Sequence, residues 1–233
     1  MTGMTTTLIT GANKGLGYEA ARRLLAEGHD AWVAARDPEK GEIAAEALGA
    51  RFVQLDVTDD ESVKAAAERV SLETGLDVLV NNAGILGRRT RVSETTPDDI
   101  RLVFETNVLG IVRVTQALLP LLERSTNPVI VNVSSGMGSL AVTTDSSRLE
   151  STLNSLAYPT SKTAVNMLTT QYAKAFPQIR INAVDPGYTA TAFNEHRGTK
   201  PVEQGAEIIV RMATLDGFGP TGTFVDENGA VAW

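Results

Sequence analysis

The stretch TGANKGLG, residues 10–17, joins a strand-like segment to a helix-like one. Before it, residues 5–10 (TTTLIT) have the β-branched and apolar composition of a buried parallel strand. After it, Ala20 and Leu24 recur at helical spacing, and Gly28 stands where a helix C-terminal cap belongs. The stretch is therefore predicted to be a tight turn between a strand and a helix.

The glycines of this turn suit close contact with a phosphate. Gly11, Gly15 and Gly17 lack a Cβ, so the chain can turn tightly, admit a pyrophosphate and pack the helix on the strand. The turn also gathers backbone N–H groups at a helix N-terminus, which favours an anion. The spacing is G-x-x-x-G-x-G rather than G-x-G-x-x-G, so an ordinary tight turn stays open beside a dinucleotide site.

Composition narrows the class of protein. The 233 residues, 42% of them hydrophobic, fit one α/β domain over 1–233, or at most two small domains. A net charge of −7 argues against nucleic acid or an anionic membrane as the main partner. The chain has no cysteine, which excludes disulfides, thiol nucleophiles and Cys-based metal sites and fits a reducing compartment.

Targeting segments and metal sites are not expected. The start, MTGMTTTLITG, lacks the basic and apolar regions of a signal peptide, and no apolar run reaches membrane-spanning length. We therefore interpret the protein as cytoplasmic. His29 is one of two histidines and has no clustered ligands, so an exposed polar residue is favoured there over a metal ligand.

Strand-like runs alternate with amphipathic helical segments almost to the end. Further strands are predicted at residues 30–35, 51–55, 76–80, 128–133 and 179–184, with a short seventh near 223–225. Helices are predicted at residues 39–48, 60–73, 97–124, 156–176 and 201–214. This alternation calls for right-handed crossovers and a doubly wound parallel sheet of about seven strands, with helices on both faces.

Residues suited to chemistry follow the predicted strands. In open sheets of this kind, ligands bind beyond the carboxyl ends of the strands. The residues at these ends are 10–17, Arg36, Asp56, 81–84, Ser134 and Ser135, and 185–191.

The end of the second strand favours a phosphorylated ribose. A site for a free ribose 2′-OH usually has an acidic residue here, whereas this chain has Ala35 and then Arg36. The following Asp37 suits a helix N-cap. Arg36 and Lys14 are either two solvated surface charges or two cations converging on a 2′-phosphate, and their convergence favours NADP over NAD.

An asparagine faces the core stripe of the helix predicted at 97–124. Asn107 lies four residues from both Val103 and Ile111. An unpaired buried amide costs about 1–3 kcal/mol, so a hydrogen-bonding partner is expected. A purely structural core asparagine is the alternative to a role in the site.

The sequence Tyr158-Pro-Thr-Ser-Lys162 places a phenol and an ammonium on one helix face. Pro159 fits only the first turn of a helix, so Tyr158 and Lys162 are one turn apart. Bringing a phenol pKa from about 10 to about 7 takes about 4 kcal/mol, more than an exposed lysine supplies. A lysine in a partly dry cleft beside an oxidised nicotinamide is the functional interpretation, although this pattern alone matches often by chance.

Together these motifs resemble the short-chain dehydrogenase/reductase family in its single-domain form, over residues 5–190, and within it the NADPH-dependent carbonyl reductases. The motifs occur in family order: TGxxxGxG at 10–17, NNAG at 81–84, Asn107, the serine of VNVSS at Ser135, Tyr158 and Lys162, and Pro186-Gly187. The resemblance implies a Rossmann-like fold.

The resemblance also implies a chemistry. A hydride passes between NADP(H) and a small-molecule ketone, aldehyde or alcohol, with Tyr158 as general acid or base. Ser135 is implied to hydrogen-bond the carbonyl oxygen, and Lys162 to lower the Tyr158 pKa and hold the nicotinamide ribose. Asn107 is implied to complete a proton relay through a water. The cofactor contacts that the resemblance implies are Gly11, Asn13, Lys14, Gly15, Leu16, Gly17, Arg36, Asp56, Val57, Asn82, Ala83, Gly84, Tyr158, Lys162, Pro186, Gly187 and Thr189.

Two other classes are open to such a fold. A catalytically silent dinucleotide-binding redox sensor is one, but such proteins typically lack the tyrosine or the lysine, and both are here with the serine. An extended epimerase or dehydratase has a different glycine spacing and a larger substrate domain. The sequence does not specify the substrate or the stereochemistry of the product.

One departure from the family lies between Ser135 and Tyr158, which are further apart than usual. The extra segment, residues 141–156, is rich in serine and threonine. In carbonyl reductases an insertion here covers a helix face that relatives use for tetramers, so we expect a monomer or homodimer. A loop on the substrate side is the alternative.

The region after Pro186 is short and predicts a small or open substrate pocket. Tyr188, Phe193 and His196 are candidates to line it, but anchoring of the loop is the favoured interpretation. The tail is predicted to form a strand, a turn at 227–229 and a packed Trp233.

Overall fold

A mostly parallel sheet forms the centre of the molecule. The structure, a computed structural model, describes residues 4–233, so the first three residues of the N-terminal stretch lie outside it. Eight strands run in the order β3-β2-β1-β4-β5-β6-β7-β8, and only β7 and β8 pair antiparallel. The strands are β1 Thr6–Thr10, β2 Asp30–Ala35, β3 Arg51–Gln54, β4 Val78–Asn81, β5 Val129–Val133, β6 Arg180–Val184, β7 Phe224–Asp226 and β8 Gly229–Ala230. The predicted doubly wound α/β fold is confirmed, with β8 as a strand that the sequence did not predict.

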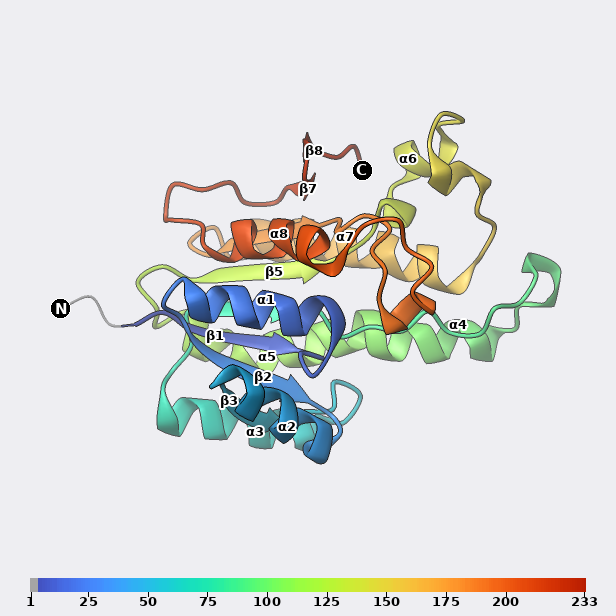
Figure 1. Cartoon of the computed structure of the whole chain (residues 1–233). Helices are drawn as coiled ribbons and strands as arrows, with labels where there is room; N and C mark the ends of the chain where they lie inside the picture. The colour runs from blue at the N-terminus through green and yellow to red at the C-terminus, as the bar shows by residue number, and fades with distance from the viewer. Residues whose placement is uncertain (1–3) are drawn as a thin grey trace.

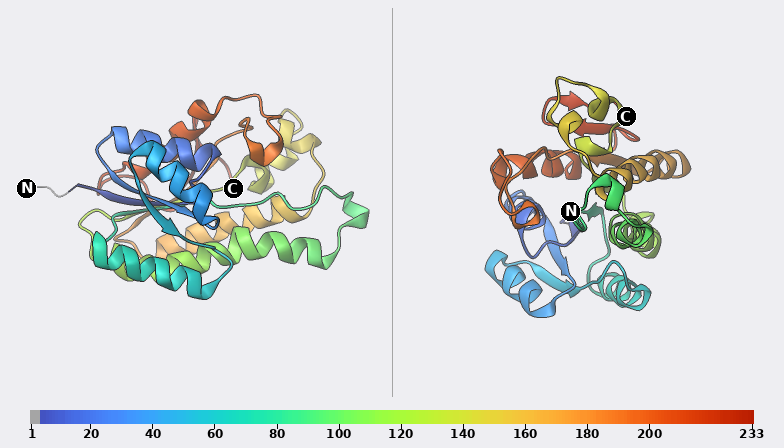
Figure 2. Two further views of the ribbon diagram at one scale, coloured as in Figure 1. Left: turned by 60° about the horizontal axis from the view of Figure 1, so that its bottom comes forward. Right: turned by 90° about the vertical axis from the view of Figure 1, so that its right-hand side faces the viewer.

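Helices cover both faces of this sheet (Figures 1 and 2). The helices are α1 Gly15–Ala26, α2 Pro38–Leu48, α3 Asp60–Glu73, α4 Pro97–Phe104, α5 Gly110–Leu122, α6 Leu140–Thr144, α7 Ala157–Ala175 and α8 Val202–Ala213. One apolar cluster joins α1, α2 and α8 to the sheet, and a second joins α3, α5 and α7 to the other face. The order of strands puts β1 and β4 side by side in the middle, where the two halves of the chain meet.

Local signals fix where the helices begin and end. The Asp37 side chain accepts the backbone N–H of Lys40 and caps α2, as predicted. Thr96 and Asp99 form a capping box at the start of α4. Gly28 follows α1 with φ at 89°, a left-handed conformation that favours glycine. These caps place the adjoining loops at the ends of the strands.

The helix predicted at 97–124 contains a wide turn that the sequence did not predict. α4 and α5 form one continuous rod, but Glu105–Leu109 between them is a π-helix. By length and composition alone this rod passes for a membrane span, with a mean hydropathy of 1.4. Of that window 44% is buried inside the protein, where its apolar face packs beneath the sheet, so we interpret it as a core helix.

The C-terminal tail closes one edge of the molecule. β7 and β8 form a hairpin about the predicted turn, and Trp233 stacks on Phe224 with 5.7 Å between ring centroids. The tail also holds the segment after β5, since Ser139 Oγ donates to the Ala232 carbonyl at 2.6 Å and the Ala141 N–H to that of Trp233 at 3.2 Å. The predicted turn and the packed tryptophan are both confirmed.

Candidate active site

A cleft of about 1010 Å³ opens at the carboxyl ends of the strands. It holds most of the predicted site residues: Gly11, Asn13, Lys14, Gly15, Leu16, Arg36, Asp56, Val57, Asn82, Ala83, Gly84, Ser135, Tyr158, Lys162, Pro186, Gly187 and Thr189. Gly17 and Asn107 do not line it and lie behind its wall. Segments more than a hundred residues apart in sequence therefore meet at one site.

The glycine turn is bound to the NNAG segment. Gly11 and Gly15 have φ angles of 65° and 59°, where a side chain is strained. A Cβ on Gly17 would lie 2.5 Å from Asn82 Nδ2, so no side chain fits there. Asn82 Nδ2 donates to the Thr10 carbonyl at 2.8 Å. The close packing of Gly17 against Asn82 and the hydrogen bond from Asn82 to Thr10 therefore hold the glycine turn in its conformation.

The start of α1 fits a phosphate group. Its N-cap, Lys14, has an extended backbone, and the Lys14 side chain makes no capping hydrogen bond. The first backbone N–H groups of a helix have no partner within the helix, and here they lie at the cleft beside the glycine turn. Donors and helix dipole together favour an anion at this point. The residues present therefore fit the pyrophosphate of a dinucleotide.

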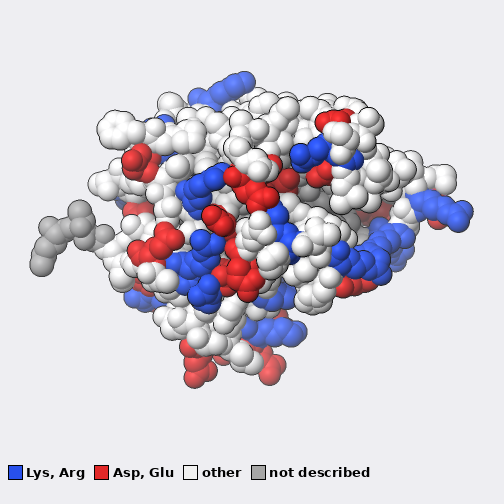
Figure 3. Space-filling model, turned by 45° about the horizontal axis from the view of Figure 1, so that its top comes forward, with Lys and Arg blue, Asp and Glu red and all other residues white. Residues whose placement is uncertain are grey.

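Basic side chains gather at the outer end of this half of the cleft. Lys14 and Arg36 line it as predicted, with the Arg36 side chain 79% exposed and its Nε 4.0 Å from Asp56 Oδ2. Lys40 lines it as well, and sequence analysis missed this residue. Asp37 is engaged by Lys40 at 2.5 Å and by its capping role. Acidic and basic groups are interspersed over the middle of the face in Figure 3, and a larger group of basic side chains lies at its right.

Ser135, Tyr158 and Lys162 meet in the other half of the cleft. Tyr158 stands in the first turn of α7, Lys162 one turn further, and the Lys162 Nζ lies 5.6 Å from the Tyr158 ring centroid. Ser135 lies just beyond β5, close enough to the Tyr158 side chain to act on its pKa. The structure therefore brings the three predicted catalytic groups together.

The loop after β5 is locked onto α7. A Cβ on Gly138 would lie 2.7 Å from the Lys162 carbonyl carbon, so the two backbones touch. The Gly138 carbonyl accepts Thr163 Oγ1 at 3.0 Å and Asn166 Nδ2 at 3.2 Å. This contact fixes Ser135 relative to Tyr158 and Lys162.

Asn107 lies in the π-helix and is fully buried. Its Nδ2 donates to the Ile85 carbonyl at 2.9 Å and to Ser161 Oγ at 3.0 Å, and its Oδ1 accepts the Ile85 N–H at 2.8 Å. The expected partner of the amide is therefore the protein itself. Asn107 ties the loop after β4 to α7, and its implied part in a water relay stays a prediction.

Burial changes the acidity of both reacting groups. It raises the pKa of Tyr158 above its ordinary value of 10, with the Ser135 hydrogen bond acting in the opposite direction. It lowers the pKa of Lys162 to about 8. The Lys162 Nζ donates to the Val133 carbonyl at 2.8 Å. The direction at Tyr158 is opposite to the predicted one, because burial of the phenol outweighs the hydrogen bond, so these protein groups hold it protonated.

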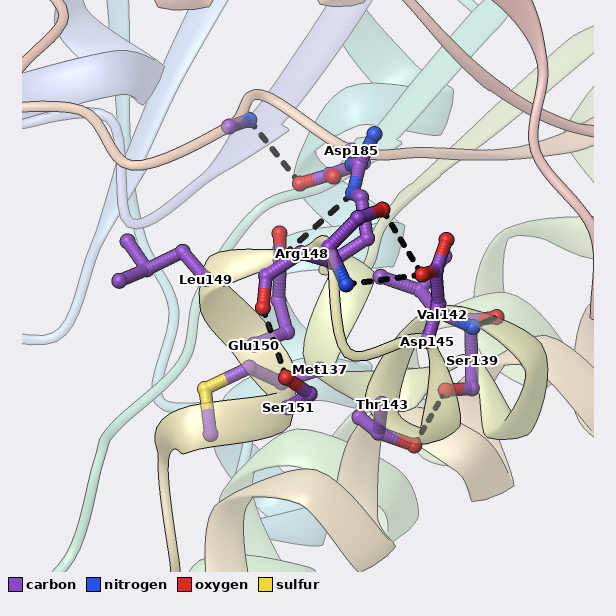
Figure 4. A network of polar contacts seen from close by, with 12 residues as sticks. Met137, Ser139, Val142, Thr143, Asp145, Arg148, Leu149, Glu150, Ser151 and Asp185 are labelled. Atoms are coloured by element: carbon purple, nitrogen blue, oxygen red, sulfur yellow. Dashed lines mark hydrogen bonds and ion pairs between the residues drawn. The ribbon is translucent and has the colours of Figure 1, made fainter.

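Two acids, Glu150 and Asp185, line the same cleft, and Figure 4 shows both with their polar contacts. Asp185 directly follows β6, and its carboxylate accepts the Gly187 N–H at 2.9 Å and lies close to Gly136. Burial and then the charge of Glu150 raise the pKa of Asp185. Glu150, in the short helix Leu149–Thr152, forms an ion pair with Arg148 at 3.6 Å. The sequence predicted that Asp185 lies at the end of a strand. It did not predict Glu150 as a site residue, because no motif marks Glu150 within its serine-rich segment.

Aromatic and aliphatic side chains line the cleft beside Tyr158, and Arg89 and Arg197 line it nearby, each paired with Glu195. Tyr188 and Phe193 line it and are 42% and 41% exposed, and the Phe193 ring centroid lies 5.8 Å from that of Tyr158. For these two residues the structure matches the prediction that they line the pocket, and their part in anchoring the loop stays a prediction. Leu149 and Leu153 also line the cleft, so the segment 141–156 forms one of its walls, as the alternative prediction had it.

The two histidines lie apart from the cleft. His29 is half-buried rather than exposed, because its Nδ1 lies 2.7 Å from Thr7 Oγ1, and burial lowers its pKa. His196 is exposed and has φ at 59°. Among residues 4–233 no three His, Asp or Glu side chains form a metal-type cluster.

Comparison with known proteins identifies the family. A family model described as short chain dehydrogenase matches residues 5–201, which include the glycine turn, Ser135, Tyr158 and Lys162. The chain belongs to the short-chain dehydrogenase family. It is accordingly an enzyme of an oxidoreductase family with a Rossmann fold.

Relatives agree with this assignment. The short-chain dehydrogenase anuI of Penicillium roqueforti is 39% identical over 221 residues, covering 89% of this chain and 87% of that protein. The carbonyl reductase Sniffer of D. melanogaster superposes with a TM-score of 0.85 at 25% identity, covering 99% of this chain and all of the other. A short chain dehydrogenase from Shigella flexneri complexed with NADP has a TM-score of 0.79 at 29% identity, covering 95% and 96% of the two chains.

Proposed function

We propose that this short-chain dehydrogenase is an NADPH-dependent reductase of small-molecule ketones or aldehydes. The observation that carries the proposal is that Ser135, Tyr158 and Lys162, with Lys162 one helical turn from Tyr158, line one cleft together with the glycine turn. The similarity to a carbonyl reductase supports the direction of the reaction. A cytoplasmic location, which fits the absence of cysteine, belongs to the same proposal.

NADPH is proposed rather than NADH because of charge. Lys14, Arg36 and Lys40 line the end of the cleft beyond β2. Asp37, the nearest acid in sequence, is occupied by Lys40 and by the N-cap of α2. A guanidinium there favours a 2′-phosphate over a free hydroxyl. The similar protein complexed with NADP supports this choice.

The chain's own residues bear the acid chemistry. When bound, the cofactor would supply the hydride to the carbonyl carbon. Tyr158, held protonated by burial, donates its proton to the carbonyl oxygen. Ser135 hydrogen-bonds the same oxygen and stabilises the charge that develops on it. Lys162, with a pKa of about 8, is mostly charged at neutral pH and stabilises the phenolate that remains.

The test is NADPH oxidation, followed by absorbance, with a panel of ketones, aldehydes and diketones. Turnover should vanish in Tyr158→Phe, which keeps the ring and removes the acid. Tyr172→Phe is the matched control, because Tyr172 lies on the same helix but does not line the cleft. In parallel assays, turnover with NADH in place of NADPH should be much slower.

Binding separates the other outcomes. Tight NADPH binding by fluorescence without turnover of any carbonyl in the panel would favour a silent dinucleotide-binding sensor. Absence of NADPH binding would overturn the cofactor site at the glycine turn as well. Turnover that survives in Tyr158→Phe would remove Tyr158 from the chemistry.

A further inference from the structure

We propose that Glu150 and Asp185 make this cleft selective for carbonyl compounds that carry a positively charged nitrogen. The inference rests on the proposed reductase function and adds the substrate class to it. Its basis is the wall of the cleft on the side of Ser135; Lys14, Arg36 and Lys40 lie at the opposite end, and Arg89 and Arg197, which also line the cleft, are both paired with Glu195.

Glu150 and Asp185 reach the same point from two different elements. A Cβ built on Gly136 would lie 2.8 Å from Glu150 Oε1 and 2.9 Å from Asp185 Oδ2. Both residues line the cleft, and Gly136 directly follows Ser135. Figure 4 shows Glu150 between the short helix Leu149–Thr152 and Asp185. The two carboxyl groups therefore flank the backbone that carries the proposed oxyanion donor.

Asp185 carries the less compensated of the two charges. It is only 5% exposed, and among residues 4–233 it has no ion-pair partner; its carboxylate accepts the Gly187 N–H at 2.9 Å. Glu150 pairs with Arg148 at 3.6 Å, and 20% of its side chain stays exposed. A ligand cation beside the two carboxyl groups is attracted by both, whereas a neutral ligand is not.

The rest of the wall suits an organic cation in particular. Tyr188 and Phe193 present half-exposed rings at the mouth, and aromatic faces attract cations. Leu149 and Leu153 add exposed apolar surface to the same wall. A hydrated metal ion gains little from such a surface, whereas the carbon substituents of an ammonium group are buried there. Because Glu150 and Asp185 flank Gly136, the residue after Ser135, the nitrogen belongs close to the carbonyl that Ser135 would bind.

The experiment compares ketones that differ only in charge. One pair is 1,1-dimethyl-4-oxopiperidinium and 4,4-dimethylcyclohexanone, in which a carbon replaces the quaternary nitrogen, and the quaternary centre keeps its charge at every pH. We expect kcat/KM of the unaltered enzyme with NADPH to favour the cation by about tenfold or more. Glu150→Gln and Asp185→Asn should each reduce that ratio toward one, chiefly through the KM of the cation.

A matched control is available on the same segment. Asp145 is exposed, does not line the cleft and accepts the Ser147 N–H at 2.9 Å. Asp145→Asn removes the same charge at a distance from Glu150, so the ratio should stay at its original value. An equal fall in all three variants would mean a general field effect and would overturn the proposal, as would a ratio near one in the unaltered enzyme.

A binding measurement keeps this inference separate from the reductase proposal. Calorimetry with 1,1-dimethylpiperidinium, which has no carbonyl to reduce, should give binding to the protein with NADP⁺ and much weaker binding to Glu150→Gln. Cation binding without turnover of any ketone would support the role of Glu150 and Asp185 and would contradict the reductase proposal. Turnover of neutral ketones without cation binding does the reverse.

Discussion

Lys162 is a basic side chain that is almost completely buried. Its side chain is 4% exposed, and burial brings its pKa down to about 8. Because this pKa lies below the ordinary value of 10.5, the charged form is present below pH 8 and is lost as the pH rises through that value. The residue whose charge supports Tyr158 thus titrates within the working range of many enzymes.

We therefore predict a basic limb in the pH profile of reduction. The value of kcat/KM should fall about tenfold for each pH unit above about 8, since this ratio reports ionisations of the free enzyme. Steady-state assays from pH 6 to pH 10 measure it. Lys162→Arg keeps its charge throughout, so any activity it retains should show no such limb. A limb at the same pH in that variant would assign the ionisation to another group.

Arg36 is predicted to determine the choice of cofactor. Arg36→Ala should raise the KM for NADPH about tenfold and change that for NADH little, because a charge-assisted hydrogen bond to a phosphate contributes about 1.5–3 kcal/mol. Steady-state assays with each cofactor in turn measure both KM values. Arg101→Ala, an exposed arginine on α4 outside the cleft, is the control. Equal losses for both cofactors would argue against a 2′-phosphate contact.

At this scale the sequence predicted groups that carry their own local pattern. Tyr158 and Lys162 stand one turn apart on one helix, so spacing alone pairs them. The pairing of Glu150 with Asp185 depends on how a long segment folds back on the sheet, which no local spacing encodes. Asn82 lines the cleft, and its amide also binds the Thr10 carbonyl, a contact that depends on the pairing of β1 with β4 and not on local spacing.

Among the elements, the rod of α4 and α5 contains a π-helical turn that the sequence did not predict. Its apolar periodicity predicted a regular helix, and Val103 and Ile111 are both buried as expected. The wide turn Glu105–Leu109 between them escaped prediction because one extra residue in a turn barely alters that periodicity. It places Asn107 against the backbone of Ile85, which is how the rod reaches the loop after β4.

Asn107→Leu is accordingly predicted to weaken the fold by about 1–3 kcal/mol. The substitution leaves the N–H and carbonyl of Ile85 without their buried partner, and such groups are costly to leave unpaired. Urea unfolding measures the loss. Gln116→Leu is the control, because Gln116 lies exposed on α5 and pairs with no such group. A loss confined to activity, with unchanged stability, would contradict this account of the asparagine.

For the molecule as a whole, alternation of strands and helices predicted the layers and the order of the elements well. Residues 141–156 were harder, because their course depends on the tail: Ser139 and Ala141 bind the carbonyls of Ala232 and Trp233, almost a hundred residues away in sequence. The wall of the cleft on that side is therefore a product of the complete fold, which a local pattern cannot predict.

The oligomeric state is a prediction at this scale. We expect a monomer or a homodimer, on the view that the insertion at 141–156 interferes with the packing of four subunits. Light scattering at several protein concentrations measures the mass in solution, starting from 24.8 kDa for one chain. A stable mass of four chains would mean that this segment serves the cleft alone.

The two edge strands of the sheet affect how readily the protein aggregates. β3 and β8, the outermost strands, are only four and two residues long, so few unpaired backbone groups face outward. On β3, Arg51 pairs with Asp30 at 2.8 Å and with Glu73 at 3.2 Å, which sets charge along that margin. Short, charged edges resist the addition of strands from other molecules. The long, buried strands that would template aggregation lie in the interior of the sheet, where neither margin exposes them.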